Sequence, residues 1–186
     1  MLKKALAGAL FLGAVSALPA MAADDTIARF NGGIGVIPVS SGVAPVVSQL
    51  TSEVVNRNFV RGVQPAGQIW VIDKLDARVR ASGQITVRGK GLILGGGNNA
   101  GRATGQSVFA TLICDVPVTT PPTPFTQHST NLTGVLLSPG GDFKIDDTLS
   151  PVLPLPFDCA NPMLLIRTAG SGNWFAVGIP HTGNDD

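Results

Sequence analysis

The sequence contains few of the residues on which enzymes and metalloproteins usually depend. Among its 186 residues there are two histidines and two cysteines, Glu53 is the single glutamate, and charged residues make up 13%. The chain has no GxSxG nucleophile elbow, no GxxxxGK[ST] phosphate loop and no CxxC pair. These absences give no support to an α/β-hydrolase, a P-loop nucleotide-binding protein or a zinc-binding domain.

Tyrosine is absent, and phenylalanine and tryptophan are few, so aliphatic side chains must build the core. Helical periodicity is almost missing too. Short apolar segments alternate instead with glycine and proline signals, a pattern typical of antiparallel all-β proteins. We therefore predict a single-domain antiparallel β-sandwich or barrel with one disulfide.

The first 22 residues read as a secretory signal peptide. Lys3 and Lys4 precede a short apolar run over residues 5–15, and Ala20-Met21-Ala22 matches a small-x-small cleavage site. We expect residues 1–22 to be removed, residues 23–186 to form one β-domain, and the tail from about residue 182 to be disordered. No second long apolar run follows, so no membrane span is expected in the mature chain. The leader looks bacterial, which indicates a secreted protein of the periplasm or the medium.

The mature chain would carry 11 basic and 12 acidic residues, a net charge of −1, so nucleic acid is not an expected partner. The charges are unevenly placed. Residues 57–102 hold eight basic and two acidic residues, whereas residues 103–186 hold two basic and seven acidic ones. In one interpretation the two regions face each other within one fold, and their charges form local pairs or are solvated by water. In the other, the basic region presents a basic sheet face to an anionic partner.

Cys114 and Cys159 are the only cysteines, and an exported protein meets an oxidising environment. The simplest arrangement is one disulfide that closes 44 intervening residues. Two separate buried thiols are the alternative. A metal site is not expected, because no further cysteine and no histidine stands at ligand spacing.

The clearest structural signal is a long β-hairpin over residues 68–94. Apolar and polar residues alternate along both arms, with Leu75, Ala77 and Val79 on one face of the first arm. Ala81-Ser82-Gly83 fits a three-residue loop with a left-handed glycine.

That loop sets the register of the hairpin. It places Val79 opposite Ile85, so that apolar side chains meet on one face, and it makes Asp76 and Arg88 a cross-strand pair. The opposite face then carries Arg78, Arg80, Arg88 and Lys90, which are the candidate binding residues for an anionic partner.

The same residue patterns predict the secondary structure of the other segments. Residues 28–39 indicate two short strands around a glycine turn, with Pro38 at a sheet edge. Residues 45–56 fit a short helix or a strand. Residues 60–68 and 95–104 indicate loops, and residues 106–114 a central strand covered on both faces. The remaining predictions are an exposed proline-rich connection over 115–128, strands over 129–137 and 142–147, a turn over 138–141, and a hairpin of strands 163–168 and 174–179.

No residue is assigned a catalytic or metal-binding role from the sequence, and no cofactor is implied. We expect His128 in a surface loop and His181 beside the exposed tail. The acidic set Asp142, Asp146, Asp147 and Asp158 matches no calcium-loop spacing and is expected to solvate turns and strand ends. Trp70 and Trp174 lie in apolar strand runs and are expected in the core rather than in a carbohydrate site. Asn131-Leu132-Thr133 is a formal glycosylation sequon, relevant only in a eukaryotic host.

Several runs resemble a group of short secreted bacterial proteins that has no assigned biochemical function. They are FNGGIGVIPVS, RGVQPAGQIWVI, GQSVFATLIC, GDFKIDDTLSP and NWFAVGIP. The resemblance implies export and a compact domain, and it supplies no catalytic residue.

Three hypotheses for the function follow. The leading one is an exported, non-enzymatic β-domain, structural or ligand-binding, at the cell envelope or in the medium. The second is a small secreted hydrolase that uses His128 with an aspartate. The third is adhesion to an anionic envelope polysaccharide through the basic face of the hairpin.

Overall fold

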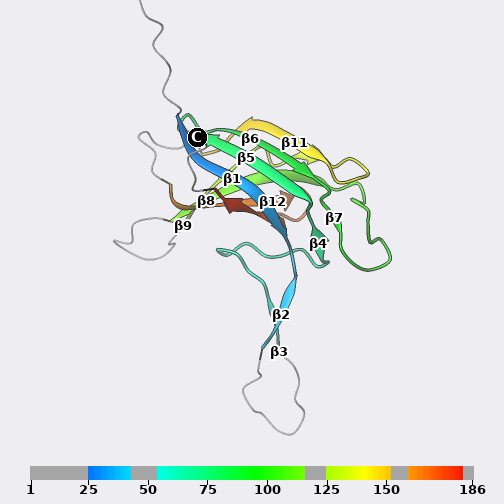
Figure 1. The fold of residues 1–186 in the computed structure, drawn as a ribbon. Coiled ribbons are helices and arrows are strands. Elements are labelled where there is room, and N and C mark those ends of the chain that lie inside the picture. The colour runs from blue at the N-terminus through cyan, green and yellow to red at the C-terminus, as the bar shows by residue number, and fades with distance from the viewer. Residues whose placement is uncertain (1–24, 43–53, 116–124, 152–158, 182–186) are drawn as a thin grey trace, which may run out of the picture.

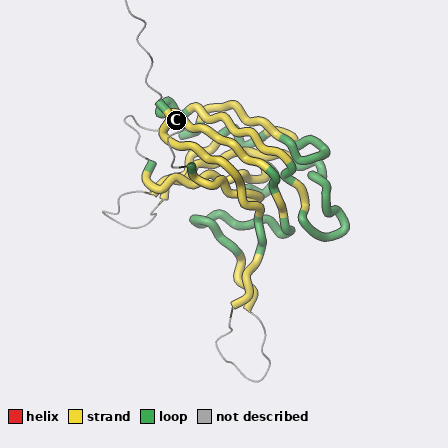
Figure 2. Tube along the Cα trace, viewed as in Figure 1, coloured by secondary structure: helices red, strands yellow, loops and turns green. Residues whose placement is uncertain are grey.

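A computed structural model describes residues 25–42, 54–115, 125–151 and 159–181, and in these ranges every regular element is a strand (Figure 2). The predicted all-β class is confirmed. The strands are β1 (Thr26–Gly35), β2 (Val39–Gly42), β3 (Val54–Arg57), β4 (Trp70–Val71), β5 (Lys74–Arg80), β6 (Gln84–Lys90), β7 (Ile93–Leu94), β8 (Ser107–Asp115), β9 (Phe125–Ser129), β10 (Val135–Leu136), β11 (Phe143–Thr148), β12 (Ala160–Thr168) and β13 (Trp174–Pro180).

Nine strands form one antiparallel sheet in the order β10-β8-β12-β13-β1-β5-β6-β11, with β9 also paired to β8. The sheet curls into a half-barrel (Figure 1). Its two ends are tied together, because the Asn131 backbone N–H donates to Asp147 Oδ2 over 2.8 Å and Ser129 forms a bridge with Ser150. Two further pairs, β2 with β3 and β4 with β7, lie outside this sheet, and β2 and β3 project from it as an arm (Figure 1).

The central hairpin has the predicted register. Val79 lies opposite Ile85 and Asp76 opposite Arg88. Gly83 has φ +84°, and its N–H donates to the carbonyl oxygen of Arg80 over 2.9 Å, which closes the three-residue loop. Asp76 and Arg88 face each other in the ladder without forming an ion pair.

The pairing of the hairpin continues beyond β5 and β6 into β4 and β7, but the ladder is interrupted between the two pairs. Trp70 pairs with Leu94 in the separate β4–β7 ladder, after a break at which the Asp73 N–H donates to the carbonyl oxygen of Lys90. Beyond the break β4 turns towards β1, where the Trp70 N–H donates to the carbonyl oxygen of Val36. A Cβ on Gly35 would collide with the Trp70 backbone, so this crossing requires glycine.

Strand β8 is an interior strand, as predicted, although it lies next to the β10 end of the sheet. Residues 108–114 are all buried, with β12 paired along one edge and β9 and β10 along the other. Cys114 at its end is bonded to Cys159, with 5.0 Å between their Cα atoms, so the predicted disulfide is confirmed.

Both tryptophans belong to the core, as predicted. The rings of Trp70 and Phe175 stack with centroids 4.0 Å apart. Trp174 is also buried, and its indole Nε1–H donates to the carbonyl oxygen of Asn58 over 3.0 Å, which satisfies its one polar atom.

The prediction for residues 28–39 was wrong. A single strand, β1, passes through Gly32 as a bulge with φ +92° rather than a turn, and it lies between β13 and β5 rather than at an edge. The bulge lets the first half of β1 pair with β5 and the second half with β13. Pro38 precedes β2, which pairs with β3.

Residues 54–57 are strand β3, the second of the two alternatives for residues 45–56, and residues 45–53 lie outside the described part. Two other segments differ from prediction. Residues 125–129 form β9, which shortens the predicted proline-rich connection, and residues 131–134 form a turn before the two-residue β10. The hairpin of β12 and β13, the turn at 138–141 and strand β11 agree with prediction.

The predicted signal peptide and the tail from residue 182 lie outside the described residues. Within the described ranges no helix has the length and apolarity that crossing a bilayer requires.

The disulfide is expected to supply a large share of the folding free energy. It joins residues separated by 45 positions, and loop-closure entropy for that length is worth roughly 4 kcal/mol. A Cys114→Ala/Cys159→Ala variant should lose about that much unfolding free energy in urea titration, and the wild type should lose a similar amount under reducing conditions. A loss below about 1 kcal/mol in both would contradict this role.

Candidate functional site

The four predicted binding residues lie together on the outer face of the central hairpin. Arg78 and Arg80 alternate with buried residues along β5, and Arg88 and Lys90 do so along β6. All four are exposed, since successive side chains of a strand point to opposite faces and the inner face belongs to the core.

The neighbouring strands extend this surface. Arg29 of β1 lies beside β5, and Lys144 of β11 lies beside β6, with their side chains on the same face. We call the resulting surface the basic face, and it consists of Arg29, Lys74, Arg78, Arg80, Arg88, Lys90 and Lys144. Along these four strands the same face carries two carboxylates, Asp76 and Asp146.

Cations lie directly opposite cations at three places on the basic face. Arg29 is the cross-strand partner of Arg78, Lys74 of Lys90, and Lys144 of Arg88. Directly opposed like charges destabilise a sheet. Their repetition across three adjacent ladders therefore lowers stability, and it concentrates positive charge on one surface.

The acids on and near the basic face neutralise it in part. Asp25 lies 3.9 Å from Arg80, and Asp146 lies 3.5 Å from Lys144, with all four side chains about half exposed or more. Ion pairs this exposed are screened by water and are worth little.

A small polar hollow of about 90 Å³ opens on this surface. Its lining includes Arg29, Asn31, Asp76, Arg78 and His181. The backbone N–H of His181 donates to the carbonyl oxygen of Arg29 over 2.9 Å. His181 is exposed, as expected. Its position brings a residue from the end of β13 to the basic face.

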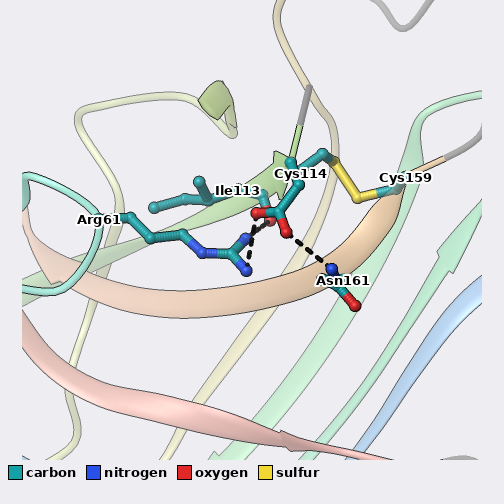
Figure 3. A network of polar contacts seen from close by, with 6 residues as sticks. Arg61, Ile113, Cys114, Cys159 and Asn161 are labelled. Atoms are coloured by element: carbon teal, nitrogen blue, oxygen red, sulfur yellow. Dashed lines mark hydrogen bonds and ion pairs between the residues drawn. A yellow bond between two sulfur atoms is a disulfide. The ribbon is translucent and has the colours of Figure 1, made fainter. Parts of the chain in front are cut away.

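Arg61 has a structural role apart from the basic face. Its Nη1 donates to the carbonyl oxygen of Ile113 over 2.9 Å, and its Nη2 lies 3.0 Å from Asp115 Oδ1 (Figure 3). The guanidinium also lies over the ring of Phe125. Asn161 Nδ2 donates to the other oxygen of Asp115 over 2.7 Å. This network holds the segment after β3 against the end of β8, beside the disulfide.

Arg167 is also partly buried. Burial lowers the pKa of its guanidinium. Its Nε donates to the carbonyl oxygen of Gly172 over 2.6 Å, and its guanidinium lies over the ring of Phe109. Arg167 thereby fixes the turn between β12 and β13.

The prediction that His128 lies in a surface loop was wrong. His128 is buried in β9, and its Nδ1–H donates to the carbonyl oxygen of Pro151 over 2.9 Å. Its neighbour Ser129 points to the opposite face, where its hydroxyl lies 2.9 Å from that of Thr111. The adjacent histidine and serine therefore do not form a nucleophile–base pair.

The acidic residues occupy turns and strand ends, as expected. Asp142 Oδ1 accepts a hydrogen bond from the Gly91 N–H over 3.1 Å, and Asp147 accepts from the backbone N–H groups of Asn131 and Thr148. Among the described residues no group of three histidine, cysteine or acidic side chains is placed to hold a metal ion. Asp158 lies outside the described ranges.

Comparison of the chain with protein-family models, with curated proteins and with solved structures finds no match. The candidate site is therefore defined by its geometry alone.

Sequence reasoning found the hairpin part of the basic face and missed Arg29, Lys74 and Lys144. Lys74 follows the same alternation as the other exposed residues of β5, so the sequence pattern could have identified it. Arg29 and Lys144 belong to strands distant in sequence, and no local pattern shows that these strands flank the hairpin.

Replacing one member of an opposed pair should stabilise the protein. Lys90→Glu turns the Lys74–Lys90 repulsion into attraction, and we expect a gain of about 0.5 kcal/mol in unfolding free energy at low salt. Arg102→Glu, an exposed change of the same charge outside the sheet, serves as the control. Equal shifts in the two variants would show that net charge, rather than the opposed pair, is responsible.

Proposed function

We propose that this protein is an exported, non-enzymatic binding domain that holds an anionic polymer of the cell envelope or the surrounding medium on its basic face. The observation that carries the proposal is the set of three cation–cation pairs across adjacent strands. A sheet surface under selection for stability alone would place opposite charges there. Departures from such local rules are expected at functional sites.

The shape of the surface suits a polymer rather than a small anion. Adjacent strands lie about 4.8 Å apart, and residues on one face recur about every 6.8 Å along a strand. Seven cations on this grid can meet several carboxylate, phosphate or sulfate groups of one chain at once. The affinity is then a sum of weak, exposed contacts and falls with ionic strength.

Export is the second part of the proposal. The apolar leader with its small-x-small site supports it, and the Cys114–Cys159 disulfide is compatible with an oxidising compartment. An envelope or extracellular location would bring the basic face to acidic polysaccharides, which are abundant anionic polymers outside the cytoplasm.

Charge reversal tests the binding role. An Arg78→Glu/Arg88→Glu variant should bind immobilised heparin and polygalacturonate at least about tenfold more weakly at low salt, since it removes two cations and adds two repulsive charges. The matched control is Arg57→Glu/Arg102→Glu, which changes the net charge equally at exposed positions outside the basic face. Equal losses of affinity in both variants would show that net charge, rather than the basic face, determines binding, and would contradict the proposal.

Export has its own test. When the full chain is expressed in a Gram-negative host, the protein recovered from the periplasm or medium should begin at Ala23 by mass spectrometry. Retention of an intact N-terminus in the cytoplasmic fraction would contradict this part of the proposal while leaving the binding role open to its own measurement.

A further inference from the structure

A second recess lies away from the basic face, where four separate parts of the chain meet. It is an open cleft of about 380 Å³ between residues 66–70, Leu94, residues 104–106 and the β12–β13 turn. The stacked pair Trp70 and Phe175 underlies it together with Leu94. Its volume lies at the lower end of the range of roughly 300–1,000 Å³ in which small-molecule sites are found.

The polar lining of this cleft contains no ionisable side chain. Its polar groups are amides and hydroxyls, contributed by Gln68, Thr104, Gln106, Thr168, Ser171 and Asn173. Each of these groups both donates and accepts hydrogen bonds. Such a lining matches a ligand whose own groups also donate and accept, above all the hydroxyl groups of a sugar.

Part of the lining is held in place by the protein itself. The Thr168 hydroxyl donates to Gln106 Oε1 over 3.2 Å, and the Thr168 N–H donates to the carbonyl oxygen of Asn173 over 2.9 Å. The side chain of Gln68 makes no hydrogen bond to the described residues, and neither does that of Ser171. The rim therefore combines fixed groups with others that remain available to a ligand.

The backbone at the rim is also unusual. Thr104 has φ +53°, a left-handed conformation that a β-branched residue rarely adopts, and Gly105 follows with φ +67°. Backbone strain of this kind concentrates at ligand-binding sites, where the surrounding structure maintains it.

We propose that this cleft binds a short segment of a neutral glycan, about one or two sugar rings in length. A charged ligand would find no counter-charge in the lining. A wholly apolar ligand would cover the amides and hydroxyls without giving them partners, which is costly. An uncharged, polyhydroxylated ligand can form hydrogen bonds with the polar rim and pack its carbon atoms against the apolar floor. The site is independent of the basic face, whose residues do not line it.

Glycine positions at the cleft allow a direct test. Gly170 and Gly67 line it, neither has a positive φ, and a Cβ on either would meet no atom closer than 3.9 Å. Gly170→Leu and Gly67→Leu therefore add bulk at the lining of the cleft without backbone strain. Gly140 is the matched control: it is exposed in the 138–141 turn, and its Cβ would have equally open surroundings. Unchanged thermal unfolding of each variant confirms that it is folded.

The probes are tetrasaccharides of α-linked glucose, β-linked glucose and β-linked N-acetylglucosamine, titrated against the mature protein by calorimetry and NMR. We expect at least one to bind saturably, with an affinity that changes less than about twofold between low and high salt. Gly170→Leu and Gly67→Leu should weaken it at least about tenfold, and Gly140→Leu should not. Absence of saturable binding by every probe at about 10 mM, or binding that both cleft variants retain, would overturn the proposal.

Discussion

The register of the β5–β6 hairpin is the constraint on which most of this structure depends. Because side chains alternate along a strand, one pairing decides both surfaces at once. With Val79 opposite Ile85, the apolar residues of both strands enter the core, and the arginines and lysines necessarily share the outer face. A shift by one residue would bury charges and expose the core. The hydrophobic effect that stabilises the half-barrel therefore also assembles the basic face.

The two proposed binding surfaces differ in physical character and in origin. The basic face is an array of cations on the outer side of four adjacent strands, and it suits a long anionic chain that makes many weak contacts. The cleft is concave and uncharged, and it is built from loops and strand ends beside the Trp70–Phe175 stack. The two proposals together describe a domain that would contact both acidic and neutral parts of a polysaccharide.

Features of this fold that depend on residues close in sequence could be predicted, whereas features that depend on distant strand partners could not. The hairpins and the turn at 138–141 depend on alternation and turn residues close in sequence, and strand β8 depends on a continuous apolar run. These predictions are confirmed. The bulge at Gly32 was mistaken for a turn, because a glycine pair signals both and only the two partners of β1 decide between them. His128 was placed in a loop because proline precedes it, yet pairing with β8 draws β9 into the sheet.

The sequence by itself determined the all-β class, the hairpin register, the disulfide partners and the cations of β5 and β6, since each depends on local pattern or on the presence of only two cysteines. Only the tertiary structure decided the strand order, which brings Arg29 and Lys144 beside the hairpin and so opposes like charges across the β1–β5 and β6–β11 ladders. It also decided the cleft, whose lining comes from four separate segments. Strand order and cleft result from long-range packing, in which many segments compete for the same neighbours, and no local pattern encodes the outcome.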